Sequence, residues 1–352
     1  MSNTTTGISV MGLDLGDRQS HFCLMDEAGE VVQKGTVGTN EPHLTRWASG
    51  MAPTRVVMEA GTHSIWIRRL LMRLGHEVIV ANPNRMKLIT QSTNKNDRVD
   101  AEWLALAGRM PERFIKPVEH RPEQMQEDLA VMRSRAHLVE SRTAHVNHVR
   151  GILKSLGLRM PTCDAKYFHT KAALYIPGHP GIAATVPVIA ELTKQIDALD
   201  KEVGRLINER YPIARHLQAV PGVGPITSLA FVLTINDPHR FKKSRQVGAY
   251  IGLTPKQRQS GDHNPELRIT KAGNAYLRQL LVEVGHTILR PNAQDSDLRR
   301  WGLKRMENGG KNAKKRVLVA IARKVAVLLH RLWVTGEVYQ PLYHSEAPME
   351  AA

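Results

Sequence analysis

The hydrophobic residues of this chain change their period along the sequence, and this change constrains the fold more than any other feature. The first third alternates strand-like runs with one amphipathic helical run, HSIWIRRLLMRLG, which Gly75 is expected to end. Three strands in hairpin order come first, followed by strand, helix and strand. This order predicts an α/β domain with a mixed sheet. The strand-like runs are GISVMGLDLG, SHFCLMD, EVVQKGTVGT, RVVMEAG and EVIVANP.

The middle of the chain carries apolar residues at alternating steps of three and four, with one step of seven. This heptad spacing predicts two long helices, joined by a loop that contains Pro161, Pro177, Pro180 and Pro187. The helices fit a long hairpin or a coiled coil between subunits, and equally a helix pair inside one domain. The apolar positions are Met125, Leu129, Met132, Ala136, Val139, Val146, Val149, Leu153 and Leu156, then Ile189, Leu192, Ile196, Leu199, Val203 and Leu206.

A length of 352 residues is typical of two or three domains. The patterns place an α/β domain at 8–115, the long helices at 121–212 and a mainly helical domain at 213–338. We expect residues 339–352 to form a disordered tail.

The charge balance points to an anionic partner. Lys and Arg number 49 and Asp and Glu number 33, so the formal net charge is +16, which favours nucleic acid or an anionic surface. The two cysteines have no metal-ligand spacing and are expected to be reduced. There is no signal-peptide pattern, and Arg323 and Lys324 interrupt the longest late apolar run. We therefore expect a cytoplasmic protein that does not contact membranes.

Four carboxylates have unusual positions. Asp14 lies in the strand-like run GLDLG, Glu59 ends the run RVVMEAG, and Asp97 and Asp100 begin a predicted helix in NKNDRVDAEWLA. Asp97 and Asp100 repel each other at this spacing. The alternative interpretation is that Asp97 caps the helix and Asp100 is a solvated acid of its first turn. Four acids that meet at one end of a sheet can hold Mg²⁺, often as a pair of ions.

Two further segments are candidates for contacts with phosphate. In VPGVG, Gly222 and Gly224 resemble the hairpin of a helix-hairpin-helix module, although an ordinary helix–helix turn fits equally well. Ser260 lies in the polar stretch RQSGDHNPELR, where a plain turn is the simpler interpretation. The cations around Ser260 can hold a phosphate and would suit a serine nucleophile for phosphodiester chemistry. These cations are Lys256, Arg258, Arg268 and Lys271.

Taken together, these segments resemble the DEDD transposases of insertion-sequence family 110. The resemblance runs from about residue 8 to about residue 335 and is carried by VVMEAG, NKNDRVDAEWLA and SGDHNPELRITKAGNAYLR, among others. The acidic tetrad of that family corresponds to Asp14, Glu59, Asp97 and Asp100, and its serine to Ser260.

The resemblance implies a recombinase that excises and inserts its own element. Its N-terminal domain would have the RNase H/RuvC-like fold and bind Mg²⁺, expected as two ions per site. The serine would form a covalent phosphoserine with DNA, in a site composed from different protomers. The heptad helices would join protomers into a dimer or tetramer. Some members of the family use a structured non-coding RNA of the element, and the protein would be bacterial and nucleoid-associated when on DNA.

Three other functions fit parts of the sequence. GLDLGDRQSHFCLMDEAG superficially resembles the phosphate loop of actin-like or sugar-kinase-like ATPases, but the later motifs of those folds are absent from the sequence. A junction-resolving nuclease would use the acids with water and without serine catalysis. In a nonenzymatic DNA-binding protein, the acids would be helix caps.

Overall fold

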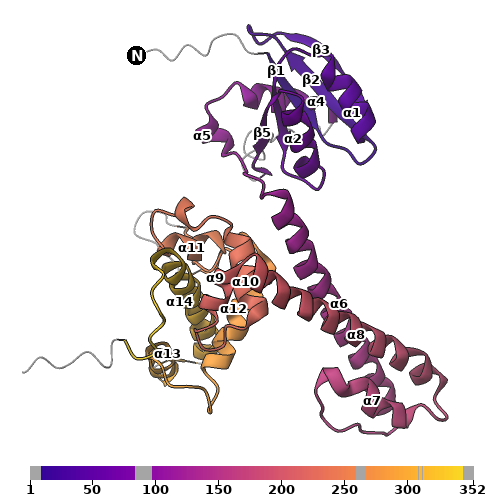
Figure 1. Ribbon diagram of the computed structural model, residues 1–352, viewed down its shortest axis with the longest axis vertical. Helices are drawn as coiled ribbons and strands as arrows, with labels where there is room; N and C mark the ends of the chain where they lie inside the picture. Colours follow the sequence, from indigo (N-terminus) through magenta and orange to yellow (C-terminus); the bar gives the residue numbers. More distant parts are fainter. Residues whose placement is uncertain (1–8, 84–96, 259–266, 308, 311, 344–352) are drawn as a thin grey trace, which may run out of the picture. The chain divides into compact units, whose positions relative to one another are not determined.

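The computed structural model describes residues 9–83, 97–258, 267–307, 309–310 and 312–343, apart from the side chains of residues 97 and 98. The chain forms two compact units, Met1–Arg121 and Pro122–Ala352. Figure 1 shows the first unit as a sheet with helices and the second as helical.

The first unit contains a mixed sheet of five strands, in the order β3-β2-β1-β4-β5. The antiparallel neighbours β1 and β2, and β2 and β3, form the hairpins that the sequence predicts, while β1, β4 and β5 run parallel. The prediction of a mixed sheet is therefore confirmed. The strands are β1 (Val10–Asp14), β2 (Gln19–Met25), β3 (Val31–Gly38), β4 (Arg55–Glu59) and β5 (Glu77–Ala81).

Helices cover both faces of this sheet. Helices α1 (Glu41–Ser49) and α2 (Ser64–Arg73) pack on one face, and α4 (Asp97–Gly108) packs on β1, β2 and β4 from the other. Gly75, at φ +90, follows the end of α2, as the sequence predicts. The sequence analysis missed α1, in which only Leu44 and Ala48 are buried. The short helix α5 (Glu112–Ile115) completes the unit.

Two long helices, α6 (Glu123–Ser155) and α8 (Pro180–Glu209), pack against each other within the second unit. The prediction of a long helix pair is thus confirmed, whereas a coiled coil between subunits remains a prediction. The loop was predicted too long, because α8 begins at Pro180 and includes Pro187. The missing N–H of Pro187 removes one helix hydrogen bond.

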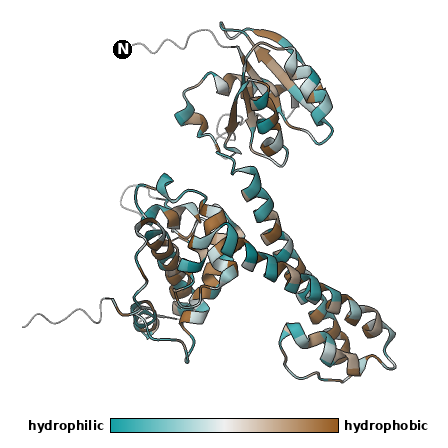
Figure 2. Ribbon diagram, in the orientation of Figure 1, coloured by the Kyte–Doolittle hydropathy of each residue, from teal (hydrophilic) through white to brown (hydrophobic). Residues whose placement is uncertain are grey.

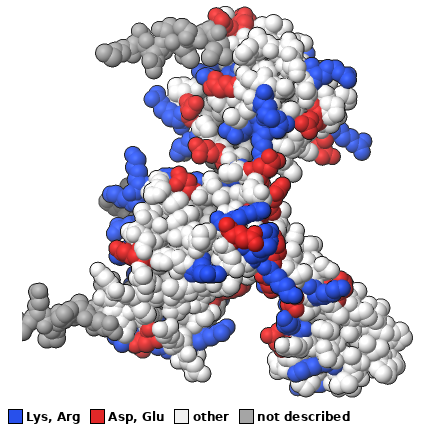
Figure 3. All heavy atoms as spheres, in the orientation of Figure 1, with Lys and Arg blue, Asp and Glu red and all other residues white. Residues whose placement is uncertain are grey.

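Polar contacts fix the register of this helix pair. Arg135 pairs with Asp200, and the buried carboxylate of Asp128 accepts hydrogen bonds from Arg210 Nη1 and the Tyr211 hydroxyl, each at 2.7 Å. Burial and the hydrogen bond to Asp128 raise the pKa of Tyr211. Figure 3 shows acidic and basic side chains intermixed over part of the hairpin, and Figure 2 shows α6 as largely hydrophilic.

Helix α10 packs against α6, α8, α9 and α12, and every residue of α10 from Thr227 to Ile235 is buried. Helices α12 and α14 pack on each other and share the largest hydrophobic cluster with α10. No described helix is long and apolar enough to cross a membrane. The remaining helices of this unit are α9 (Pro212–Leu217), α10 (Pro225–Ile235), α11 (Arg245–Tyr250), α12 (Ala275–Ile288), α13 (Asp297–Glu307) and α14 (Ala313–Thr335), with α7 (Phe168–Ala172) between α6 and α8 and 3₁₀ turns at Ala165–Tyr167, Ala173–Tyr175 and Pro238–Arg240.

Candidate functional site

Asp14 and Glu59 end two neighbouring parallel strands of the first unit. The register pairs Leu13 of β1 with Met58 of β4, so the two acids follow as the next pair along the strands. Adjacent strands lie about 4.8 Å apart, and paired residues point to the same face. The residues two positions earlier, Gly12 and Val57, face α4. Asp14 and Glu59 therefore lie together at one sheet edge, on the face that α4 covers.

Contacts along α4 show which end of this helix approaches the acids. Gly108, the last residue of α4, lies against Val10 at the start of β1. A Cβ on Gly12 would lie 1.9 Å from the Ala101 carbonyl oxygen, so the helix rests directly on the strand backbone there. The helix thus runs antiparallel to β1, and its first turn lies beside the end of the strand at Asp14. That first turn carries Asp100.

The structure therefore brings Asp14, Glu59 and the start of α4 to one edge of the sheet. Asp97 is the first residue of α4, and its side chain lies outside the described part of the chain. The side chains of Asp14, Glu59 and Asp100 are half-buried, so solvent reaches all three.

The chemistry of these side chains fits a hard divalent cation. Among the described side chains, no group of three or more His, Cys, Asp or Glu residues lies close enough to hold a metal ion. Mg²⁺ does not require such a group, because proteins commonly bind it through one or two carboxylates together with substrate phosphates. Asp14 and Glu59, on adjacent strand ends, are a pair of this kind.

Sequence reasoning missed His21, which is the β2 partner of Asp14 in the sheet register. Cys23, two residues further along β2, packs on α4, so alternation places His21 on the same face as Asp14. The alternation of the run SHFCLMD, which puts His21 on the same face as Cys23, was the only signal in the sequence, and it does not show the pairing with Asp14. His21 brings an imidazole ring to the edge that carries the acids.

A second histidine connects the loops that follow the two acid-bearing strands. His63 Nε2 lies 3.3 Å from the Asp17 carboxylate, and Trp66 Nε1 donates a hydrogen bond to His63 Nδ1 over 3.2 Å. Because an indole N–H can only donate, Nδ1 is the acceptor and the ring proton lies on Nε2, toward Asp17. This contact ties the loop after β1 to the loop after β4.

The turn after Glu59 is fixed by Ser64, at the start of α2. Its hydroxyl donates to the carbonyl oxygen of Gly61 over 2.7 Å and accepts from the Gly61 N–H over 3.1 Å. His120 Nε2 lies 3.0 Å from the Ser64 hydroxyl oxygen. Because the hydroxyl proton is already donated to Gly61, His120 donates to this oxygen. Burial, with repulsion from nearby arginines, lowers the pKa of His120. These bonds hold the backbone two residues beyond Glu59.

Ser260 lies outside the described residues, but the chain on both sides of it is described. Lys256 N–H donates to the Arg268 carbonyl oxygen and Thr270 N–H to the Thr254 carbonyl oxygen, each over 2.9 Å. These bonds, with the bridge between Pro255 and Ile269, form a two-stranded stem. We call residues 254–256 and 268–270 the serine stem, because the segment with Ser260 begins and ends there.

The serine stem rests on two glycines in the left-handed backbone region. Gly252 has φ +77, and a Cβ there would lie 2.3 Å from backbone atoms of Ala272. Gly273 has φ +69, and a Cβ there would lie 2.2 Å from the Tyr250 carbonyl oxygen. Lys271, at φ +56, is one of three described non-glycine residues with positive φ. The backbone turns tightly at this point, directly beside the stem.

We expect the Gly252→Ala substitution to destabilise the second unit by about 3 kcal/mol, because an alanine there meets both a positive φ and a backbone clash. Thermal unfolding of the full chain would measure this. Gly204→Ala on α8 is the matched control, since its Cβ would meet nothing within 4 Å and alanine favours a helix. Equal melting temperatures for the two variants would contradict the tight packing described for Gly252.

The other predicted phosphate-binding residues are exposed or half-buried. Gly222 and Gly224 lie between α9 and α10, as the sequence suggests, and Gly222, at φ +82, packs against Thr287 of α12. Their contact with phosphate remains a prediction. The stem carries or adjoins four exposed cations, Lys256, Arg258, Arg268 and Lys271.

Comparisons with known proteins match both units. A DEDD transposase model of the IS110 type covers residues 11–157, and a model described as "Transposase IS116/IS110/IS902 family" covers residues 214–300. The chain is 32% identical to the transposase for insertion sequence element IS1111A of Coxiella burnetii, over 95% of this chain and 92% of that protein. It is 31% identical to a "probable family 20 transposase" of Pseudomonas aeruginosa, over 95% and 99%. The pilin gene-inverting protein of Moraxella bovis is 28% identical over 40% of this chain and 44% of its own length.

Proposed function

Because the chain belongs to the IS110 family of DEDD transposases, we propose that it cuts and rejoins DNA strands with an acidic site and a serine nucleophile. The acidic site consists of Asp14, Glu59, Asp97 and Asp100, and the nucleophile is Ser260. The observation that carries the proposal is the position of Asp14 and Glu59 on adjacent strand ends beside the first turn of α4. The strand order, with α4 across β1 and β4, also supports an RNase H/RuvC-like fold for this unit.

The carboxylates would hold Mg²⁺, as two ions per site. A bound divalent cation stabilises the negative charge that develops on a phosphate and on its attacking and leaving oxygens. Asp14 and Glu59 would hold the cations from the strand ends, and Asp97 and Asp100 would complete the site from the first turn of α4. The His63–Asp17 contact and the Ser64 hydroxyl keep the two loops at this edge in place.

The strand-transfer chemistry would proceed in two steps. The Ser260 oxygen attacks the phosphorus of a DNA phosphodiester, and the bond from phosphorus to one deoxyribose oxygen breaks. The serine proton leaves, and the released deoxyribose oxygen gains a proton to become a hydroxyl. In the second step a deoxyribose hydroxyl of another strand loses its proton and attacks the phosphorus of the phosphoserine. The bond from phosphorus to the serine oxygen breaks, the serine oxygen regains a proton, and the new strand is joined.

The serine nucleophile distinguishes the proposed mechanism from that of a junction-resolving nuclease, which would use the acids with water. Ser260→Ala is expected to abolish covalent attachment to DNA and strand exchange, because alanine offers no oxygen to attack phosphorus. Labelled DNA that stays on the protein in a denaturing gel measures attachment. Ser134→Ala, an exposed serine on α6, is the matched control. If Ser260→Ala exchanged strands at the normal rate, the serine would have no part in the mechanism.

The partners follow from the same proposal. The chain would bind DNA and act as a dimer or tetramer, with the acids and the serine of one site supplied by different protomers. A structured non-coding RNA would select the DNA sites by base pairing while protein cations hold phosphates, as in RNA-guided nucleases. Sequencing the nucleic acid that co-purifies with the protein tests for such an RNA.

A further inference from the structure

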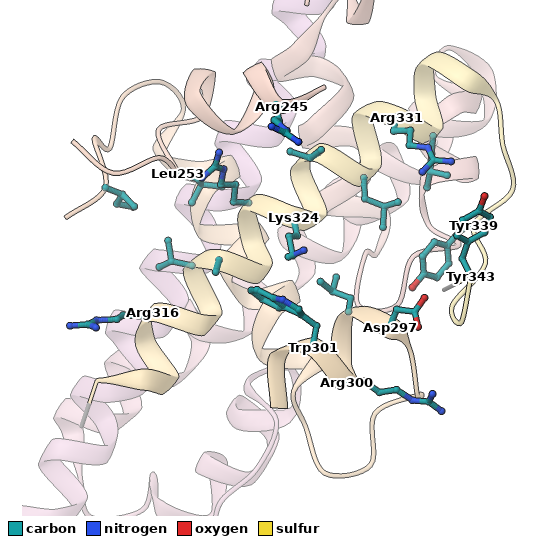
Figure 4. Close-up of a pocket in the computed structure, with 18 of the residues that line it drawn as sticks. Arg245, Leu253, Asp297, Arg300, Trp301, Arg316, Lys324, Arg331, Tyr339 and Tyr343 are labelled. Carbon is teal, nitrogen blue, oxygen red and sulfur yellow. The ribbon is translucent and has the colours of Figure 1, made fainter. Parts of the chain in front are cut away.

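We propose that a groove along α14 binds an unpaired nucleic-acid strand next to the segment that contains Ser260. The groove lies within the second unit and has a volume of about 2010 Å³. We call it the α14 groove; one face of α14 and parts of α13 and the serine stem line it, as Figure 4 shows in close-up. The inference rests on the proposed function and adds a strand-binding surface to it.

The groove reaches the serine stem at one end. Pro255 and Arg268 belong to the two strands of the stem, and both line the groove together with Lys271. A strand held along α14 would therefore pass beside the stem from which the serine segment extends. This position would bring a bound strand close to the reacting segment, which a surface for general DNA binding would not need to do.

The charge of the lining fits a polyanion. The lining contains nine Lys or Arg residues and only two acidic residues, Asp297 and Glu337. Within the described part of the chain, six of these cations form no ion pair with a carboxylate, although the Lys324 ammonium lies over the Trp301 ring. The six are Arg245, Arg268, Lys271, Lys315, Arg323 and Lys324.

The cations repeat along one face of α14. Lys315 and Arg316 lie at its start, Arg323 and Lys324 two turns later, and Arg331 two turns beyond. At 1.5 Å per residue, the span from Arg316 to Arg331 is about 22 Å. Backbone-tracking sites for single strands hold about 4–16 nucleotides, and a row of this length suits the lower part of that range.

Apolar and aromatic side chains lie between the cations, which favours an unpaired strand over a duplex. Val319, Val327 and Leu328 of α14 line the groove together with the aromatic residues Trp301 of α13 and Tyr339. A duplex presents phosphates outward and gives such side chains little to contact, whereas unpaired bases stack on aromatic rings. The volume also exceeds the range of about 300–1,000 Å³ that is typical of small-molecule sites, so a polymer fits better.

Trp301 lies in the groove wall, on a helix that packs closely on α14. A Cβ on the next residue, Gly302, would lie 2.8 Å from Ile321, so α13 packs directly on α14. The Lys324 ammonium lies 4.5 Å and the Arg305 guanidinium 5.7 Å from the centre of the Trp301 ring, in cation–π contacts. An aromatic ring beside cations can contact a base while a cation contacts its phosphate.

The test compares binding of a 12-nucleotide single strand and its 12-base-pair duplex by fluorescence anisotropy, with the full chain. The double variant Lys315→Glu with Lys324→Glu is expected to lose about tenfold or more in affinity for the single strand. Its slope of log K against log salt should fall by about 1.4, at about 0.7 per lost phosphate contact. Trp301→Ala should weaken single-strand binding about fivefold or more through lost stacking, and Trp301→Phe should restore most of it.

The matched control is Lys154→Glu with Lys201→Glu, two exposed lysines on α6 and α8. Equal losses in the control and groove variants, or equal losses for the duplex, would overturn the proposal. So would unchanged strand binding combined with a changed oligomeric state in sedimentation, because the groove would then be an interface between copies. If the groove variants bound the single strand normally and DNA cleavage still depended on Asp14, the groove would not be a strand-binding site. The proposed function would be unaffected by that result.

Discussion

The variants Asp14→Asn and Glu59→Gln are expected to lose DNA cleavage about a thousandfold while they keep their fold and their affinity for DNA. Each change replaces a carboxylate by an amide of the same shape. A divalent cation contributes several kcal/mol to the transition state of phosphoryl transfer, and each 1.36 kcal/mol corresponds to about a tenfold change in rate. The two acids lie on adjacent strand ends, so loss of either should disturb the same site.

Single-turnover cleavage of DNA that carries the ends of the element measures this loss. Glu27→Gln is the matched control, because Glu27 is an exposed acid in the turn that follows β2, at the opposite end of the sheet. A nonenzymatic DNA-binding protein would show no difference among the three variants. Full cleavage by Asp14→Asn would remove this acid from the mechanism.

Gly12→Ala is expected to destabilise the first unit by about 3 kcal/mol or more and to reduce cleavage severely. The added Cβ would lie 1.9 Å from the Ala101 carbonyl oxygen and 2.4 Å from the Ala105 nitrogen. Both are backbone atoms of α4, so the helix must move away from β1, and overpacking of this kind costs about 1–3 kcal/mol or more. The movement displaces Asp100 relative to Asp14.

Chemical denaturation of the full chain, followed by the cleavage assay under native conditions, separates the two effects of this substitution. Gly50→Ala is the control in the same unit, because a Cβ there would meet nothing within 4 Å and its φ of −87 is ordinary. Normal stability and normal cleavage by Gly12→Ala would contradict the contact that positions α4 over the strand.

The sheet could be predicted because its strands carry strong local signals. β1 and β4 are apolar runs that end in acids, and the hairpin of β2 and β3 has a turn at Glu27–Glu30. Helix α1 could not be predicted from its period, since only two of its residues are fully buried. The start of α1 could still be recognised in the sequence, because Asn40 caps the helix and a proline follows in the first turn.

The candidate acidic site was only partly readable. Acids at strand ends are visible in sequence, but the position of α4 depends on Gly12, whose missing side chain has no pattern. His21 was missed because its relation to Asp14 arises from strand pairing. The α14 groove was invisible for a similar reason, since it joins residues of the serine stem, α13 and α14 that lie far apart in the chain.

Asp14 and Glu59 are proposed to hold divalent cations at the edge of the sheet. Mn²⁺ titration followed by electron paramagnetic resonance, with the protein bound to DNA, measures this binding. We expect Asp14→Asn combined with Glu59→Gln to remove the bound Mn²⁺ that the wild type and the Glu27→Gln control retain. Equal Mn²⁺ binding by all three proteins would show that these two acids hold no cation.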